Sequence, residues 1–105
     1  MGDLPYTIAV DFDGTLCKMD WPGIGEPIEQ TINMILKAKE LDCKVILWTC
    51  REGARLQDAV EWCRLQGIEF DAVNENLQEW IDVYGNDCRK VGADLYIDDK
   101  ALRMR

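Results

Sequence analysis

Hydrophobic and polar positions along this chain fall into two alternating patterns. Four short segments are mostly apolar, as expected for strands buried on both faces of a sheet. They cover residues 6–12, 44–48, 69–73 and 94–97, and the residues from 100 onward form a short basic tail. Between these segments, apolar residues recur with the spacing of amphipathic helices. The pattern therefore predicts strands that alternate with helices.

The ends of the predicted helices carry residues that suit those positions. The first helix is expected over residues 27–41, because Pro27 fits a first helical turn. The second is expected over about 54–66, with Gly67 placed to terminate it. A third, short helix follows Asn76, whose side chain is expected to cap it. This alternation predicts an α/β fold with a parallel sheet, right-handed crossovers and helices on both faces.

Length and composition exclude several classes of protein. The chain has 105 residues, so one domain over residues 1–105 is expected. It contains no His, which excludes Ser-His-Asp and Cys-His catalysis and His-ligated zinc. Its net charge of -8 argues against the basic patch with which proteins bind nucleic acids, so a nucleic-acid partner is not expected. No apolar run approaches the roughly 20 residues that span a bilayer, so no membrane association is expected.

The cysteines indicate a reducing environment. There are 5 of them, an odd number, and no two form a C-x-x-C pair. The N-terminus lacks the basic segment and apolar stretch of an export signal. We therefore expect free thiols and a cytoplasmic protein.

Acidic and hydroxyl side chains follow three of the predicted strands. Asp11 and Asp13 end the first strand, Thr49 follows the second, and Asp98 and Asp99 follow the fourth. Because the carboxyl ends of parallel strands share one edge, these side chains are expected to meet where open α/β sheets bind ligands. Carboxylates gathered there repel one another unless a cation or a proton relieves them. Mg²⁺ suits such hard oxygen ligands.

Taken singly, each motif has an ordinary structural explanation. Asp and Gly are common turn residues, and Gly14 is expected at a turn that a side chain would obstruct. An EF-hand loop that starts at Asp11 does not fit, because Leu16 occupies its glycine position and Pro22 its glutamate position. The informative feature is the order in which the motifs follow successive strands.

With these motifs, the chain resembles the haloacid dehalogenase superfamily of phosphotransferases, over residues 8–101. The first motif of that family, an apolar strand followed by D-x-D-G-T, stands at residues 8–15. The second, a Thr that closes an apolar strand, stands at 45–49, and the fourth, an acidic pair after an apolar strand, stands at 95–99. Lys90 matches the lysine of the third motif. The resemblance implies a Rossmann-like three-layer fold with a central parallel sheet and no cap domain.

The resemblance also implies a Mg²⁺-dependent phosphatase that works through an aspartyl-phosphate. Asp11 is the implied nucleophile, and Asp13 is the group that protonates the leaving oxygen and then deprotonates water. Thr49 and Lys90 are the implied phosphate ligands. The implied Mg²⁺ ligands are Asp11, the backbone carbonyl of Asp13, Asp98 and Asp99.

The segments at which this family carries caps are short here. Residues 16–26 form only a flap, and residues 75–89 accommodate one short helix. Family members without a cap resemble enzymes with open sites, which act on macromolecular phosphates or, when oligomerisation closes the site, on small ones. The expected partner is therefore a phosphorylated substrate, and a homo-oligomer is compatible with the sequence.

The sequence leaves alternative roles for some residues near the motifs. Arg51 and Glu52 are either substrate contacts or solvated loop residues. Trp21 is a candidate wall of the pocket, whereas Trp48 is assigned to the core.

Two other functions are compatible with parts of the pattern. A response-regulator receiver also gathers Asp, Thr, Lys and Mg²⁺ at this edge of a sheet, but its acidic pair follows the first strand, whereas here the pair comes last. The other alternative is a catalytically inactive family member kept for binding. Phosphoryl turnover separates these alternatives from a phosphatase.

Overall fold

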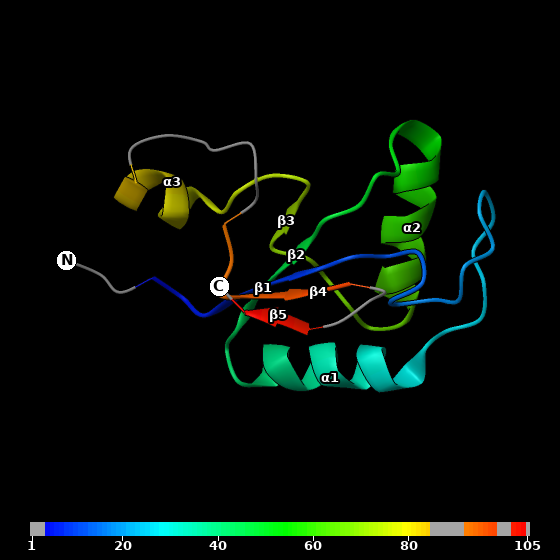
Figure 1. The fold of residues 1–105 in the computed structure, drawn as a ribbon, viewed down its shortest axis with the longest axis horizontal. Coiled ribbons are helices and arrows are strands. Elements are labelled where there is room, and N and C mark those ends of the chain that lie inside the picture. The colour runs from blue at the N-terminus through cyan, green and yellow to red at the C-terminus, as the bar shows by residue number, and fades with distance from the viewer. Residues whose placement is uncertain (1–3, 85–91, 99–101, 105) are drawn as a thin grey trace.

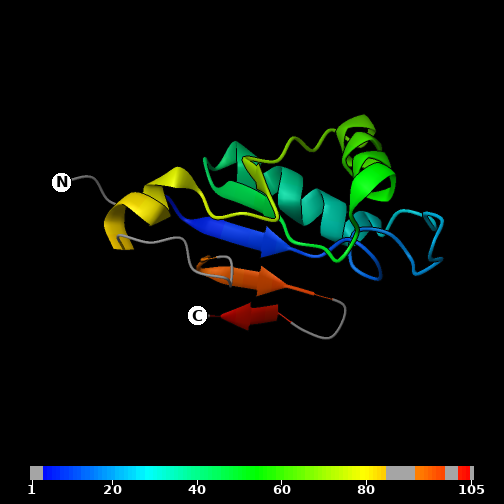
Figure 2. The same cartoon turned by 90° about the horizontal axis from the view of Figure 1, so that it is seen from above.

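Five strands form one sheet in the computed structural model, which describes residues 4–84, 92–98 and 102–104. The strands are β1 Thr7–Val10, β2 Lys44–Leu47, β3 Ala72–Val73, β4 Leu95–Ile97 and β5 Leu102–Met104. Their order across the sheet is β3-β2-β1-β4-β5 (Figure 1). Strands β1 to β4 are parallel, and β5 runs antiparallel beside β4 (Figure 2).

Helices cover both faces of this sheet. Those in the described part of the chain are α1 Glu29–Glu40, α2 Gly53–Leu65 and α3 Gln78–Tyr84. Helices α1 and α2 pack on one face, and α3 packs on the other. The structure thus confirms the predicted α/β fold. Within the described ranges, no helix is long and apolar enough to cross a membrane.

The alternation of side chains along the strands divides the core into two layers. Ile8 and Val10 of β1 lie in the larger layer, with residues of α1 and α2. Ala9 of β1 and Ile46 of β2 lie in the smaller layer, which Trp80 of α3 covers. Since both faces of the central strands are buried, these strands are apolar at successive positions.

The path of the chain explains this placement of the helices. From β1 the chain moves outward to β2 and β3, and it then returns to β4 on the other side of β1. Right-handed crossovers therefore place α1 and α2 on one face and α3 on the opposite face. The strand order reverses between β1 and β4, and open α/β sheets carry a crevice for ligands at the carboxyl ends of strands at such a point.

Two strands differ from the sequence-based prediction. Residues 69–73 contribute only the two-residue strand β3. The Asp71 carboxylate accepts the Val45 N–H at 2.8 Å, so a side chain replaces part of the expected backbone ladder. The tail beyond residue 100 contains the edge strand β5, which the prediction of a plain basic tail missed.

Two helix starts differ as well. Helix α1 begins at Glu29 rather than Pro27, because Pro27 forms a β-bridge with Cys17. Helix α3 begins at Gln78, two residues after Asn76, and the Asn76 side chain accepts the Gly92 N–H at 2.5 Å. The predicted stop after α2 is confirmed, since Gly67 has a φ of 94° that favours glycine.

Candidate functional site

Asp11 occupies the position at which β1 ends beside β4. Val10 and Ile97 are paired in the parallel register, and the Asp11 N–H donates to the Ile97 carbonyl at 2.9 Å. Asp98 is the next residue after Ile97, so Asp11 and Asp98 leave adjacent strands at the same level. The reversal point of the sheet therefore places Asp11 of the first motif beside Asp98 of the fourth motif.

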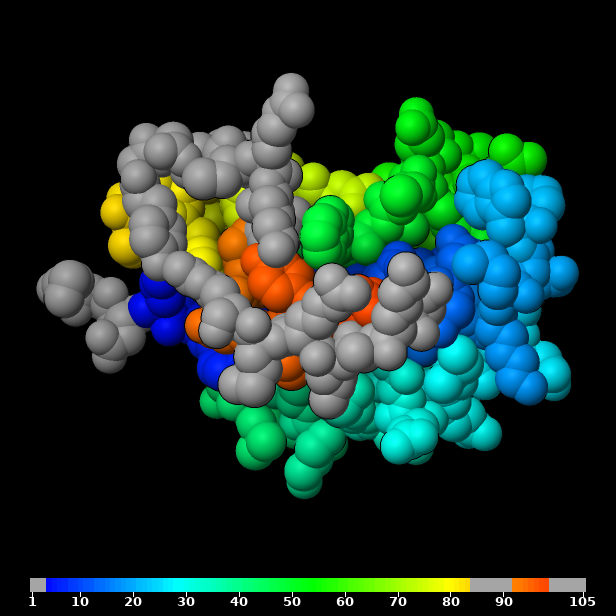
Figure 3. Space-filling model, in the orientation of Figure 1, coloured from blue at the N-terminus to red at the C-terminus, as the bar shows by residue number. Residues whose placement is uncertain are grey.

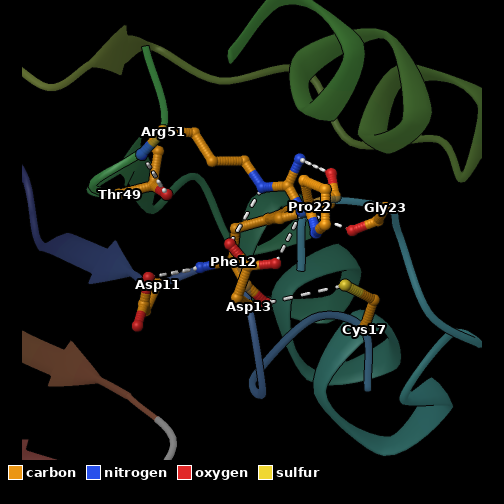
Figure 4. Close-up of polar contacts among 8 residues, drawn as sticks. All are labelled: Asp11, Phe12, Asp13, Cys17, Pro22, Gly23, Thr49 and Arg51. Atoms are coloured by element: carbon orange, nitrogen blue, oxygen red, sulfur yellow. Dashed lines mark hydrogen bonds and ion pairs between the residues drawn. The ribbon is translucent and has the colours of Figure 1, made fainter. Parts of the chain in front are cut away.

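A tight turn follows Asp11 and orients Asp13. The Phe12 carbonyl accepts the N–H groups of Thr15 and Leu16 at 3.1 and 2.9 Å. Gly14 has a φ of 80°, which confirms the predicted need for glycine in this turn. Because the chain turns here, the two carboxylates point apart: Asp13 faces Arg51, whereas Asp11 points away from it (Figure 4).

Arg51 forms a buried bidentate ion pair with Asp13. Its Nε donates to Asp13 Oδ2 at 2.9 Å, and its Nη2 donates to Asp13 Oδ1 at 2.7 Å (Figure 4). The Arg51 side chain is only 1% exposed and that of Asp13 is 14% exposed. The hydrogen bond to Asp13 raises the pKa of the Arg51 guanidinium, although burial opposes this. Of the two roles that the sequence left open, the solvated loop residue does not apply to Arg51.

The same guanidinium holds the flap of residues 16–26. Arg51 Nη2 donates to the Gly23 carbonyl at 2.6 Å, and Nη1 donates to the Pro22 carbonyl at 3.4 Å. Its central carbon lies 5.0 Å from the ring centroid of Phe12 and 5.0 Å from that of Trp21. Arg51 therefore links the first motif to the flap through both charge and ring contacts.

The flap also closes on itself at its base. The Lys18 N–H donates to the Glu26 carbonyl at 2.8 Å, and the Ile28 N–H donates to the Leu16 carbonyl at 2.9 Å. Gly25 allows this approach, because a Cβ there would overlap the Lys18 carbonyl oxygen. In Figures 1 and 2 the flap extends beyond the carboxyl ends of the strands, near α2, and Figure 3 shows its blue surface on the same side as the green one of α2.

Thr49 is positioned by hydrogen bonds of its backbone N–H and of its side-chain hydroxyl. Its N–H donates to Asn74 Oδ1 at 2.7 Å, and its Oγ1 accepts the Arg51 N–H at 3.2 Å. A hydroxyl that accepts in this way keeps its own hydrogen for donation to another group. Thr49 is thus suited to donate to an anion beside Asp11.

A pocket of about 320 Å³ joins these residues. Its lining is formed by the strand ends, the flap and the segment before α2: Asp11, Asp13, Met19, Trp21, Thr49, Cys50 and Arg51. The structure therefore brings together Asp11, Asp13 and Thr49, which the sequence predicted for one site. Asp98 follows β4 beside Asp11 but is not among the residues that line the pocket. Lys90 and Asp99, the remaining predicted site residues, lie outside the described residues.

The described carboxylates at this edge of the sheet are enough for a Mg²⁺ site that water and substrate complete, but not for one built from protein side chains alone. Among the described residues, no three Asp, Glu, Cys or His side chains come together as a metal group. Asp11 and Asp98 supply two carboxylates at adjacent strand ends, and the Asp13 carboxylate is engaged with Arg51. One or two carboxylates are what Mg²⁺ commonly takes from a protein, since water and substrate phosphate complete its octahedron.

Two neighbours of the site, Arg51 and Trp48, could not be placed correctly from the sequence, which left the role of Arg51 open and assigned Trp48 to the core. The burial of Arg51 depends on the flap folding over it, and a lone Arg after a strand carries no signal of that. Trp48 was assigned to the core but is 39% exposed, and its ring packs edge-on against Tyr96 at 5.7 Å. Trp21 does line the pocket, as the sequence suggested.

Comparison with known proteins gives one informative relationship. No protein-family model matches the sequence, and no curated protein matches it. A solved structure of a conserved protein coded by a locus of Bacteroides thetaiotaomicron superposes with a TM-score of 0.81 at 41% sequence identity. The match covers 93% of this chain and 78% of that protein. This chain therefore belongs to the same family as that conserved protein.

Proposed function

We propose that this protein is a Mg²⁺-dependent phosphomonoester hydrolase of the haloacid dehalogenase type, with the Rossmann-like fold of that superfamily. The observation that carries the proposal is the shared pocket of Asp11, Asp13 and Thr49. Asp11 and Thr49 follow the adjacent parallel strands β1 and β2. The strand order supports it further, because Asp11 lies at the reversal point where such sheets bind ligands.

The proposed reaction has two displacement steps at phosphorus. In the first, a carboxylate oxygen of Asp11 bonds to phosphorus while the bond to the leaving oxygen breaks, and Asp13 gives that oxygen a proton. In the second, water attacks the aspartyl-phosphate, Asp13 takes a proton from the water, and phosphate leaves Asp11. Thr49 donates a hydrogen bond to a phosphoryl oxygen in both steps.

Arg51 acts on this chemistry through Asp13. The bidentate pair fixes the direction of the Asp13 carboxyl group, which in this proposal exchanges a proton with the leaving oxygen and then with water. Arg51 therefore orients Asp13 between the two steps and is a positioning residue in this proposal.

Mg²⁺ would be held by Asp11, Asp98 and the backbone carbonyl of Asp13, with Asp99 as a further candidate ligand. When bound, it would supply positive charge that allows a phosphate dianion to approach the carboxylates. Lys90 is the proposed source of a further positive charge. Without such charges, the carboxylates at this edge would repel the substrate.

The test is hydrolysis of an aryl phosphate by the wild type and by Asp11→Asn, each with Mg²⁺ and with EDTA. We expect turnover by the wild type with Mg²⁺, and its loss in the variant and in EDTA. Asp42→Asn is the matched control, because it removes one charge on the exposed turn after α1 and should retain full activity.

Other outcomes would replace the proposal by an alternative. Stoichiometric phosphorylation of Asp11 by a small phosphodonor, without turnover, would indicate a receiver-like phospho-acceptor. Mg²⁺ binding without either phosphorylation or turnover would indicate an inactive binding domain. Full activity of Asp11→Asn would exclude Asp11 as the nucleophile.

A further inference from the structure

The flap presents two large apolar side chains to the proposed active site. Met19 is 60% exposed and Trp21 is 53% exposed, although both are large and hydrophobic. Both line the same pocket as Asp11 and Asp13. Their exposed surface is therefore part of the wall that a bound substrate would meet.

The flap is held in place rather than merely resting near the pocket. Arg51 bonds to the carbonyls of Pro22 and Gly23, directly after Trp21, and its guanidinium lies against the Trp21 ring. The base of the flap is closed by the Lys18 to Glu26 hydrogen bond. A wall that is already ordered lets apolar contact contribute to binding with little loss of conformational entropy.

The direction of the leaving group follows from the position of Asp13. The phosphoryl group has to lie by Asp11 and Thr49, and the leaving oxygen has to lie by Asp13, which protonates it. Asp13 is bonded to Arg51, and Arg51 lies over the Trp21 ring at 5.0 Å. The leaving group therefore extends towards the part of the pocket formed by Trp21 and Met19.

The charges of the described residues that line the pocket favour an uncharged leaving group. Among the described residues that line it, Arg51 is the one cation. Of the five N–H groups of its guanidinium, four already donate to Asp13, Pro22 and Gly23. Arg55 lies over the Trp21 ring at 5.4 Å but does not line the pocket. Among the described lining residues, a second phosphate or a carboxylate on the leaving group would thus meet only the one remaining N–H of Arg51.

The volume of the pocket limits the size of the substrate. At about 320 Å³ it lies at the small end of ligand pockets. From these observations we propose that the substrates are small phosphomonoesters with an uncharged, aromatic leaving group of the benzyl or aryl type, which Trp21 and Met19 receive. This inference rests on the proposed phosphatase function.

The test compares two substrates of which only one has an aromatic ring in its leaving group, while the leaving oxygen of both belongs to a primary alcohol. Benzyl phosphate and ethyl phosphate both release a primary alcohol of similar acidity, so the ratio of their kcat/KM values reports recognition of the ring rather than leaving-group acidity. We expect the wild type to favour benzyl phosphate at least about tenfold, which corresponds to about 1.4 kcal/mol. Trp21→Ala should abolish this preference, and Trp21→Phe should retain most of it.

Trp48→Ala is the matched control, since Trp48 is an exposed Trp that does not line the pocket. It should leave the ratio unchanged. Circular dichroism verifies that each variant is folded. Turnover with equal kcat/KM for the two phosphates, or a benzyl preference that persists in Trp21→Ala, would overturn the inference and leave the phosphatase function standing.

Binding of benzylphosphonate and ethylphosphonate, measured by calorimetry with Mg²⁺ present, separates the two proposals. Absence of any turnover would refute the phosphatase function, and the binding ratio would then decide the inference. A benzylphosphonate preference that depends on Trp21 would support the aromatic pocket. Equal or absent binding of both phosphonates would overturn it.

Discussion

The guanidinium of Arg51 donates two parallel hydrogen bonds to the carboxylate of Asp13, at 2.9 and 2.7 Å, from within the protein interior. The same group also bonds to the Gly23 carbonyl of the flap at 2.6 Å. Through Arg51, the orientation of Asp13 and the position of the flap depend on each other. A change at Arg51 should therefore alter both stability and the proposed chemistry.

Replacement of Arg51 by Met should destabilise the fold. It removes the partner of a mostly buried carboxylate, and breaking such a pair typically costs about 3 kcal/mol of the free energy of unfolding. Arg51→Lys should recover only part of this loss, because one ammonium cannot reproduce the planar fork that reaches both Asp13 and Gly23. Urea denaturation measures the three free energies.

The control for this prediction is the ion pair between Arg64 and Glu61 on the surface of α2. Both side chains are more than half exposed, at 57% and 54%. Arg64→Met should leave the free energy of unfolding unchanged within error, because water screens such pairs. Equal stability of Arg51→Met and the wild type would show that the Asp13 pair does not hold the flap.

Gly25→Ala should open the base of the flap. The added Cβ would overlap the Lys18 carbonyl oxygen, and backbone atoms have to move to relieve the overlap. Overpacking of this kind typically costs about 1–3 kcal/mol. We expect faster limited proteolysis within residues 18–26, and unchanged cleavage of this segment in Gly25→Ala would contradict the tight approach.

Asp71 should make the stability of the fold depend on acid pH. Burial opposes its ionisation, but the Val45 N–H and the ammonium groups of Lys39 and Lys44 outweigh burial and lower its pKa. A carboxylate whose pKa is lowered by folding stabilises the protein above its unfolded pKa, and this contribution is lost as the pH falls through the folded pKa.

Asp71→Asn should therefore be less stable than the wild type near pH 7. The difference should begin to fall near pH 4, where the carboxyl group of the unfolded chain becomes protonated, and disappear at lower pH, once that of the folded chain is protonated as well. Urea midpoints measured across this range test it. A difference that stays constant from pH 7 into strong acid would show that the hydrogen bonds of Asp71, and not its charge, carry the effect.

The cysteines should differ sharply in reactivity. Cys50 is exposed and lines the pocket, whereas Cys17 and Cys63 are buried. Burial raises the pKa of both buried thiols, that of Cys63 to about 12, which lowers their thiolate content. Iodoacetamide should label Cys50 in the native protein and label Cys17 and Cys63 only in denaturant, as peptide mass spectrometry would show.

A ligand provides the control for this labelling. Because Cys50 lines the pocket, benzylphosphonate with Mg²⁺ should slow its alkylation, while Cys63 should stay unlabelled with or without the ligand. Native labelling of Cys63 at the rate of Cys50 would contradict the buried placement of Cys63.

The central strands and the two long helices were predictable, because their residues carry a strong local signal. The apolar runs around Val10 and Leu47 are continuous, since both faces of β1 and β2 are buried. The edges of the sheet were not predictable. β3 is short because the Asp71 side chain bonds to β2, and β5 is a strand because β4 lies beside it. Both depend on contacts between segments that are distant in the sequence.

The sequence by itself determined which side chains follow the strands. A parallel sheet then has to bring Asp11, Thr49 and Asp98 to one edge, because parallel strands end on the same side. Only the tertiary structure decided where the carboxylate of Asp13 points and what forms the outer wall of the pocket. The turn at Gly14 directs Asp13 to Arg51, and Arg51 draws in the flap that carries Trp21. Local pattern specifies strands and their ends, whereas the partner of a buried charge is set by how distant segments pack.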